Sequence, residues 1–221
     1  MSRGGKLRLA VLISGRGSNL LAIAQACRDG RLEASIELVL SDRRDAAGLA
    51  TAAALGLATA VVDRAKFATG NAFETALAAA IDRSGAELVV LAGFMRILSA
   101  PFADSYAGRL LNIHPSLLPK YKGLDTHRRV IEAGEREHGA SVHFVTGELD
   151  GGPVLCQGRI AVRADDSPQS LAARVLAVEH RIYALAISLI AAGRVQLRGD
   201  TILLDGRVLE AAIVEDGENG H

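Results

Sequence analysis

The first half of the chain alternates short apolar runs with longer amphipathic stretches, and this rhythm restricts the fold more than any other feature of the sequence. Five runs have the length of strands and little internal alternation, as strands buried on both faces do: 9–13, 36–40, 58–62, 88–92 and 110–113. Helical segments lie between them, and a glycine soon follows the first three: 20–28, 46–55, 73–83 and 102–106. The alternation predicts an α/β fold with a doubly wound, mostly parallel sheet over residues 6–114.

Beyond residue 114 the rhythm changes. The sequence predicts a loop, a short helix, two strands, a long helix and a small hairpin: 115–123, a segment ending at Gly134, 141–145, 154–162, Ser167 to Ile190, and 201–209. Ser167 as N-cap and Pro168 at the first helical position form the clearest helix start. We expect residues 1–210 to form a single domain, with the second half, 115–210, packed on the same sheet. A C-terminal tail, 211–221, should follow, with residues 215–221 frayed.

The composition is that of a folded globular protein and excludes several classes of partner. The 221 residues are 49% hydrophobic and 23% charged. Basic and acidic residues number 25 each and aromatic residues only 4%, so neither nucleic acid nor a membrane surface is an expected partner. No apolar run approaches the ~18 residues of a membrane span, which favours a cytoplasmic protein. Cys27 and Cys156 lack disulfide or zinc-site spacing and are expected to be buried thiols.

The first polar motif is SGRGSNL, residues 14–20, which follows the first predicted strand and opens the first helix. Gly15 and Gly17 permit a tight turn and a close backbone approach. The amides of Gly17, Ser18 and Asn19 would point from a helix N-terminus toward an anion. The motif lacks both the Lys-Ser/Thr pair of a Walker A loop and the spacing of a dinucleotide fingerprint, so it fits a monophosphate best. The alternative is an ordinary tight turn.

The second motif is LLNIHPSLLP, residues 110–119, at the end of the last strand of the first half. Residues two apart in a strand face the same side, so Asn112 and His114 project together, and Pro115 ends the strand. An amide donor and an imidazole then lie at the carboxyl edge of a parallel sheet, where open α/β folds bind their ligands. A buried histidine with satisfied hydrogen bonds, beside an asparagine lining a loop, would explain the same pattern.

The remaining polar candidates are less specific. Asp150, in ELDGGP, precedes two glycines that allow its carboxylate to turn inward, but by itself the motif favours an ordinary turn. Lys120 and Lys122 fit either a phosphate patch or solvated loop side chains. No metal site is expected, because the other histidines show no metal-ligand spacing: His127, His138, His143, His180 and His221.

Together these motifs resemble a known family. SGRGSNL, AGFMRIL, LLNIHPSLLPKYKG and HGASVHFVTGELDGGPV stand in the order and at the spacing of the phosphoribosylglycinamide formyltransferases, over about residues 7–210. The resemblance implies a Rossmann-like formyltransferase fold, with a nucleotide-binding half at 6–114 and a folate-binding, catalytic half at 115–210. It also implies 10-formyltetrahydrofolate as co-substrate and glycinamide ribonucleotide as the acceptor in purine biosynthesis. We expect small-molecule partners only, and a monomer or a homodimer.

The resemblance assigns roles to residues by their places in these motifs. The catalytic trio of the family matches Asn112, His114 and Asp150. The residues that would hold the phosphate and the ribose of the acceptor are Gly17, Ser18, Asn19 and Glu179. Those that would surround the pterin of the folate are Met95, Arg96, Ile97, Leu98, Asn112, Thr146, Gly147, Glu148, Leu149 and Asp150. The sequence departs from the best-known members at peripheral positions, which puts the contacts there in doubt: Gly70, Lys122, Asp125 and Leu176.

The residue types of the trio suit formyl transfer. Transfer from N10 of a folate to a primary amine passes through a tetrahedral oxyanion and requires no covalent Ser or Cys intermediate. Asn112 would donate a hydrogen bond to the oxyanion, which contributes ~3 kcal/mol in comparable sites. His114 would support the same charge as imidazolium and then donate a proton, and Asp150 would keep it protonated at neutral pH.

Three other functions use parts of the same pattern. A formyltetrahydrofolate deformylase would use the trio with water as the acceptor, but such proteins usually carry an N-terminal regulatory domain, and only residues 1–6 precede the first strand. A methionyl-tRNA formyltransferase would need an additional RNA-binding domain, which neither the length nor the charge provides. A non-catalytic nucleotide-binding module would keep SGRGSNL with a decayed second site, and the intact trio argues against it.

Overall fold

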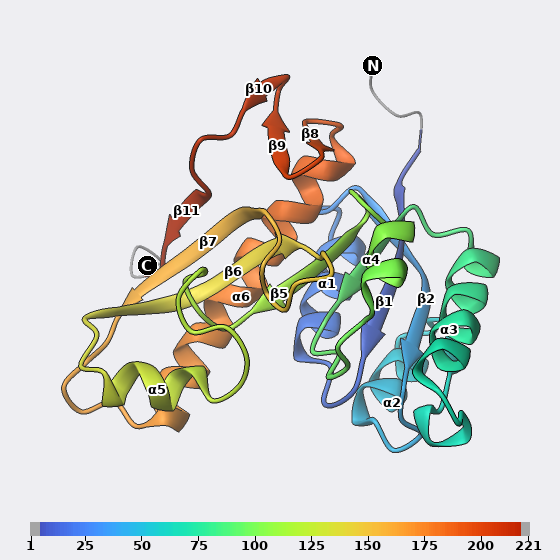
Figure 1. Ribbon diagram of the computed structural model, residues 1–221, viewed down its shortest axis with the longest axis horizontal. Coiled ribbons are helices and arrows are strands. Elements are labelled where there is room, and N and C mark those ends of the chain that lie inside the picture. The colour runs from blue at the N-terminus through green and yellow to red at the C-terminus, as the bar shows by residue number, and fades with distance from the viewer. Residues whose placement is uncertain (1–4, 218–221) are drawn as a thin grey trace.

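The computed structural model describes residues 5–217, and its first half is an alternation of strands and helices (Figure 1). The elements are β1 Leu7–Ile13, α1 Ser18–Arg28, β2 Ala34–Ser41, α2 Ala47–Ala54, β3 Thr59–Val61, the 3₁₀ turn η1 Arg64–Lys66, α3 Gly70–Ser84, β4 Leu88–Leu91, α4 Ala100–Ser105 and β5 Leu110–His114. Every strand and helix expected between residues 6 and 114 is present, with ends that differ by a few residues.

The second half adds strands to the same sheet. Its elements are α5 Thr126–Glu132, β6 Glu137–Phe144, β7 Val154–Ala161, α6 Pro168–Ala191, β8 Val195–Arg198, β9 Thr201–Leu204, β10 Arg207–Val208 and β11 Ile213–Asp216. The strand order of the main sheet is β11-β7-β6-β5-β4-β1-β2-β3. The strands from β3 to β5 are parallel, β6 is antiparallel to β5 and β7, and β11 runs parallel to β7. The predicted α/β class with a mostly parallel sheet is confirmed.

Helices cover both faces of the main sheet (Figure 1). The side chains of β1 alternate between two cores: Leu9 and Val11 pack with α1 and α6, whereas Ala10 and Leu12 pack with α3 and α4. Because β1 is buried on both sides, its sequence shows no alternation of polar and apolar residues. The same two-sided burial explains why an uninterrupted apolar run identified this strand.

The long helix α6 begins as the sequence predicts. The Ser170 amide donates to the hydroxyl of Ser167, the Ser167 amide donates to the hydroxyl of Ser170, and Pro168 occupies the first turn. Farther along the helix, the buried hydroxyl of Tyr183 donates to the carbonyl oxygen of Leu91 at 3.0 Å. This contact fixes α6 to the carboxyl end of β4.

The region after α6 contains the expected hairpin. β9 and β10 are antiparallel around Asp205 and Gly206, whose φ angles of 53° and 78° are those that a two-residue turn requires. β8 extends the hairpin to a three-stranded sheet, which was not predicted. No helix within residues 5–217 is both long enough and apolar enough to cross a membrane.

The C-terminal tail requires a correction. The prediction that residues 215–221 fray is wrong for Glu215 and Asp216, because β11 pairs with β7 at the edge of the main sheet. Exposed and half-buried positions alternate along β11, so the segment has no apolar run that would indicate a strand. Residues 218–221 lie outside the described residues.

Candidate active site

A cavity of about 480 Å³ opens at the carboxyl ends of β4 and β5. Its walls are formed by four segments and two further side chains: 93–98, 112–115, 123–127, 145–150, Leu91 and His143. In an open α/β sheet, ligands bind at the carboxyl edge of the strands near the point where the strand order reverses. The order of this sheet reverses between β1 and β4, next to the cavity.

The structure brings Asn112, His114 and Asp150 together on one wall of this cavity. β5 supplies the first two, and Asp150 reaches them from the loop between β6 and β7. The Nε2 atom of His114 lies 2.9 Å from the carbonyl oxygen of Tyr121, and its Nδ1 atom lies 3.3 Å from Oδ2 of Asp150. A carbonyl and a carboxylate both accept hydrogen bonds, so the ring is fully satisfied only when both nitrogens carry hydrogen. The geometry therefore provides an acceptor for a hydrogen on each ring nitrogen.

Backbone geometry holds the Asp150 carboxylate in this position. Asp150 has a φ of 47°, in the left-handed region that aspartate tolerates better than most residues. Its Oδ2 also accepts a hydrogen bond from the Gly123 amide at 2.9 Å. At Gly152 a Cβ would lie 1.9 Å from the carbonyl oxygen of Phe144, so a larger residue does not fit there. ELDGGP is thus a tight turn that also delivers a carboxylate to the cavity.

A second histidine, which the sequence analysis did not select, lies beside the trio. His143 stands on β6 directly opposite Asn112 on β5. Its Nδ1 lies 3.0 Å from the carbonyl oxygen of Phe144 and therefore carries the hydrogen, which leaves Nε2 to accept from Asn112 Nδ2 at 3.1 Å. Burial lowers the pKa of His143, so the ring stays neutral and keeps this acceptor. The contact follows from the pairing of β5 with β6, and a single sequence does not show which strands pair.

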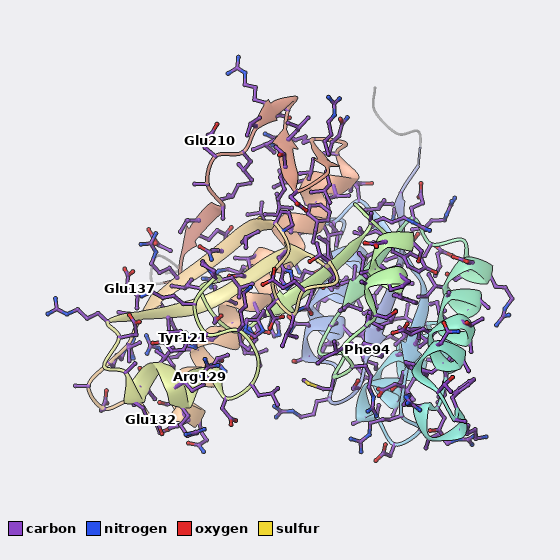
Figure 2. The ribbon with its side chains drawn as sticks, in the orientation of Figure 1. Phe94, Tyr121, Arg129, Glu132, Glu137 and Glu210 are labelled. Atoms are coloured by element: carbon purple, nitrogen blue, oxygen red, sulfur yellow. The ribbon has the colours of Figure 1, made fainter. Side chains whose placement is uncertain are left out.

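The loop that carries Tyr121 is fastened to α5. In Figure 2, the labelled residues Tyr121 and Arg129 lie close to each other. The guanidinium of Arg129 stands over the Tyr121 ring, 5.3 Å from its centre, and donates to the carbonyl oxygen of Lys122 at 2.8 Å. These contacts position the Tyr121 carbonyl oxygen that faces His114.

The residues that the resemblance assigns to the pterin all line the cavity: Met95, Arg96, Ile97, Leu98, Asn112, Thr146, Gly147, Glu148, Leu149 and Asp150. Three of them present exposed apolar side chains. Met95 is 70% exposed, Ile97 76% and Leu149 48%, whereas Leu98 is buried. Apolar side chains that gather around one concave site are typical of a ligand pocket.

The residues expected to hold the nucleotide form a separate group, and none of them lines the cavity: Gly17, Ser18, Asn19 and Glu179. Gly17 precedes α1 with a φ of 76°, and a Cβ there would lie 3.0 Å from the Cα of Gly48. The buried Asn19 donates from Nδ2 to Oε2 of Glu179 at 2.7 Å, while its Oδ1 has no hydrogen-bond partner among residues 5–217. Burial raises the pKa of Glu179, and the hydrogen bond from Asn19 opposes that rise.

The positions that depart from the resemblance have different surroundings. The Nζ atom of Lys122 lies 2.6 Å from Oε1 of Glu148, so it joins two of the cavity's loops at the rim. Asp125, with a φ of 57°, precedes α5 and lines the cavity. Gly70 begins α3 and Leu176 lies in α6, and neither residue lines the cavity.

The remaining ionisable side chains of interest are cysteines and histidines outside the trio. Within residues 5–217, no group of three or more His, Cys, Asp or Glu side chains is arranged to hold a metal ion. Cys27 and Cys156 are free thiols, the first half-buried and the second buried. The Nδ1 atom of His127 lies 3.0 Å from Nε2 of His138. Burial, together with the nearby histidines, lowers the pKa of His138 to about 4.

Known proteins resemble this chain over nearly its whole length. Residues 7–187 match the family model described as formyl transferase. The phosphoribosylglycinamide formyltransferase of Escherichia coli (strain K12) is 50% identical over 203 residues, which cover 92% of this chain and 96% of that protein. The trifunctional purine biosynthetic protein adenosine-3 of Gallus gallus is 41% identical over 192 residues, 87% of this chain and 19% of that protein. The solved phosphoribosylglycinamide formyltransferase of Coxiella burnetii, in complex with CHES, has a TM-score of 0.91 at 45% identity and covers 95% of this chain and 99% of its own. The chain belongs to the phosphoribosylglycinamide formyltransferase family.

Proposed function

We propose that this chain transfers a formyl group from 10-formyltetrahydrofolate to the primary amine of N1-(5-phospho-D-ribosyl)glycinamide, a step of de novo purine biosynthesis. The observation that carries the proposal is the contact between the His114 ring and Asp150 beside the Asn112 amide, on the wall of the 480 Å³ cavity. Membership of the formyltransferase family supports a formyl folate as the co-substrate.

The cavity suits a flat, partly apolar ring with polar edges. Met95, Ile97 and Leu98 supply apolar surface, and the loop 145–150 supplies backbone and side-chain polar groups. The described residues therefore fit the pterin of a folate. The nucleotide acceptor would bind next to it, with its phosphate on the amides that follow Gly17 and its ribose hydroxyls on the carboxylate of Glu179.

Asn112 would stabilise the oxyanion that forms when the amine attacks the formyl carbon. Its side-chain nitrogen carries two hydrogens, and His143 accepts one of them. The second hydrogen is available to the developing oxyanion, where a fixed donor contributes ~3 kcal/mol. Because the acceptor amine is itself the nucleophile, no residue of the chain has to form a covalent intermediate.

His114 would supply positive charge and a proton. Its Nδ1–H stays on Asp150, while its Nε2–H exchanges the carbonyl oxygen of Tyr121 for the substrate. Replacing one acceptor by another keeps the number of hydrogen bonds constant, so the exchange is inexpensive. The proton then moves to the folate nitrogen as its bond to the formyl carbon breaks, and the proton that the attacking amine loses on becoming an amide returns the ring to its charged form.

The alternative acceptor is water, which would make the chain a deformylase. The relatives from Escherichia coli and Coxiella burnetii are named phosphoribosylglycinamide formyltransferases, and this favours an amine as the acceptor. The Asn19–Glu179 pair also favours a nucleotide as the acceptor, because it is a polar group outside the cavity lining that hydrolysis of a formyl folate does not require.

One assay tests the proposal. The protein is mixed with a 10-formyl folate analogue, and release of the deformylated folate is followed with and without glycinamide ribonucleotide. We expect release only when the ribonucleotide is present, in equal amount to the formylated product. Release at the same rate without the acceptor would identify a deformylase, and no release in either mixture would exclude both activities.

A further inference from the structure

Asp42 is a buried carboxylate that accepts hydrogen bonds from two residues far apart in the sequence, Ser14 and Arg96. It follows β2, is 1% exposed and does not line the cavity. Its Oδ1 accepts a hydrogen bond from the Ser14 hydroxyl at 2.6 Å, and its Oδ2 accepts from Nε of Arg96 at 2.5 Å. A buried carboxylate is strongly unfavourable unless it is paired and hydrogen-bonded, so these two contacts belong together.

Both contacts lead to the cavity wall between β4 and α4. The segment 93–98 contains no helix or strand, yet it presents the exposed apolar side chains of Met95 and Ile97 to the cavity. Such a segment is not held in place by a regular hydrogen-bond ladder or by burial of those side chains. The buried side chains of Phe94 and Leu98 anchor the segment to the core, and the stretch between them also depends on contacts at its backbone and at Arg96.

Ser14 connects the carboxylate to this backbone. The Ser14 hydroxyl donates to Asp42 and accepts from the amide of Met95 at 2.8 Å, and the Ser14 amide donates to the carbonyl oxygen of Gly93 at 3.1 Å. A carboxylate has no hydrogen to donate, so it orients the serine hydrogen toward itself and leaves the oxygen lone pairs for Met95. The direction of the relay is thus determined by Asp42.

We propose that Asp42 is a positioning residue for the folate side of the site. Through Ser14 and Arg96 it holds the segment 93–98 in the shape that lines the cavity, and it touches no substrate itself. The inference rests on the proposed function, because it takes this cavity to be the folate pocket. It assigns Asp42 to the binding of the folate and not to the chemistry of the trio.

The test compares Asp42→Ala with a matched variant, Asp166→Ala. Asp166 is also a buried carboxylate, with 4% side-chain exposure, and pairs with Arg174 at 2.6 Å at the start of α6, outside the lining of the cavity. Calorimetry gives the affinity of each folded variant for 10-formyl-5,8-dideazafolate and for glycinamide ribonucleotide, and steady-state kinetics give kcat and both KM values.

We expect Asp42→Ala to weaken folate binding roughly tenfold and to raise the folate KM to match, since a charge-assisted buried contact is lost. Affinity for the ribonucleotide and kcat at saturating folate should stay within about twofold. Asp42→Asn keeps an acceptor for Arg96 and a donor for Ser14, and it should recover most of the folate affinity. Asp166→Ala should leave the folate affinity unchanged.

Ser14→Ala provides an independent test that does not depend on the folding of Asp42→Ala. It removes the relay to Met95 but keeps the pair of Asp42 and Arg96, so it should weaken folate binding several-fold. Equal losses of folate and ribonucleotide affinity, or an unchanged folate affinity in folded Asp42→Ala, would overturn the inference. A parent protein that binds no folate analogue would overturn the proposed function, and this inference with it.

Discussion

Asn112 and His143 face each other across the antiparallel pair of β5 and β6, and the hydrogen bond between them determines which way the Asn112 carboxamide points. The neutral His143 ring accepts from the amide nitrogen, so the nitrogen and not the oxygen of Asn112 faces β6. In the proposed reaction this nitrogen is the donor to the oxyanion. The orientation of Asn112 therefore depends on a residue that has no direct part in the proposed reaction.

His143→Leu should lower kcat roughly tenfold or more, because a donor that is free to turn no longer meets the oxyanion in a fixed position. Both KM values should change little. His143→Gln, whose amide oxygen reaches about as far as Nε2 and accepts a hydrogen bond, should retain more activity than the leucine variant. Steady-state kinetics on the two variants check this, and equal kcat values in both would show that His143 does not orient Asn112.

Asn112→Ala and His114→Ala should each lower turnover about a hundredfold while the affinities for folate analogue and ribonucleotide change only a few-fold. The reason is that both contacts become stronger as the oxyanion forms, so they act on the transition state more than on the bound substrates. Single-turnover kinetics and calorimetry separate the two effects. If either variant keeps nearly the turnover of the parent, the role assigned to the replaced residue is wrong.

Asp150→Asn should lower turnover more than it lowers either binding affinity. Asparagine tolerates the positive φ of this position, so the turn is kept while the charge that faces His114 is removed. Without that charge His114 loses the carboxylate that faces its Nδ1, so the ring supports the positive charge of the proposed proton donor less well and kcat should fall, while both binding affinities change little.

Steady-state kinetics and calorimetry on the folded Asp150→Asn variant measure this. A variant with the turnover of the parent would mean that Asp150 only shapes the loop.

Gly17→Val should weaken binding of the ribonucleotide at least tenfold and leave the folate analogue largely unaffected. A side chain at this position meets the backbone of Gly48 and blocks the approach of a phosphate to the amides of α1. Gly30→Val is the matched control, because Gly30 also has a positive φ but open space around its Cβ position. Calorimetry that finds the same ribonucleotide affinity in both variants would remove Gly17 from the site.

The buried His138 should make the fold less stable in acid. Its pKa is about 4 in the folded protein and near 6.5 in an unfolded chain, so between these values the unfolded state binds more protons. Above pH 6.5 this histidine does not lower the free energy of unfolding. As the pH falls from 6.5 toward 4, it lowers that free energy by ~2 kcal/mol once partial solvation is allowed for. The urea concentration at the midpoint of unfolding should therefore fall less between pH 7 and pH 4.5 in His138→Gln than in the parent. An equal loss in both proteins would assign the acid sensitivity to other groups.

The sequence predicts the elements of this fold that depend on local pattern. Strands buried on both faces read as apolar runs, and the pairing of Asn112 with His114 follows from the two-residue period of a strand. Only the resemblance identified Asp150 as a site residue. A left-handed backbone conformation brings its carboxylate to His114, and the two residues are 36 positions apart in the sequence, so no local pattern reveals their contact. His143 and β11 were missed for a related reason: each depends on a neighbouring strand whose register no local pattern reveals.

The pairing of β11 with β7 also has a consequence for synthesis of the protein. β7 leaves the ribosome before α6 and the three-stranded sheet, and its outer edge is paired only when residues 213–216 have been made. Until then the edge exposes unpaired N–H and C=O groups, to which the same strand of another nascent chain can add. On a polysome, several copies of the chain are synthesised close together. The time that passes before β11 is made therefore sets how long the edge of β7 can pair with another copy.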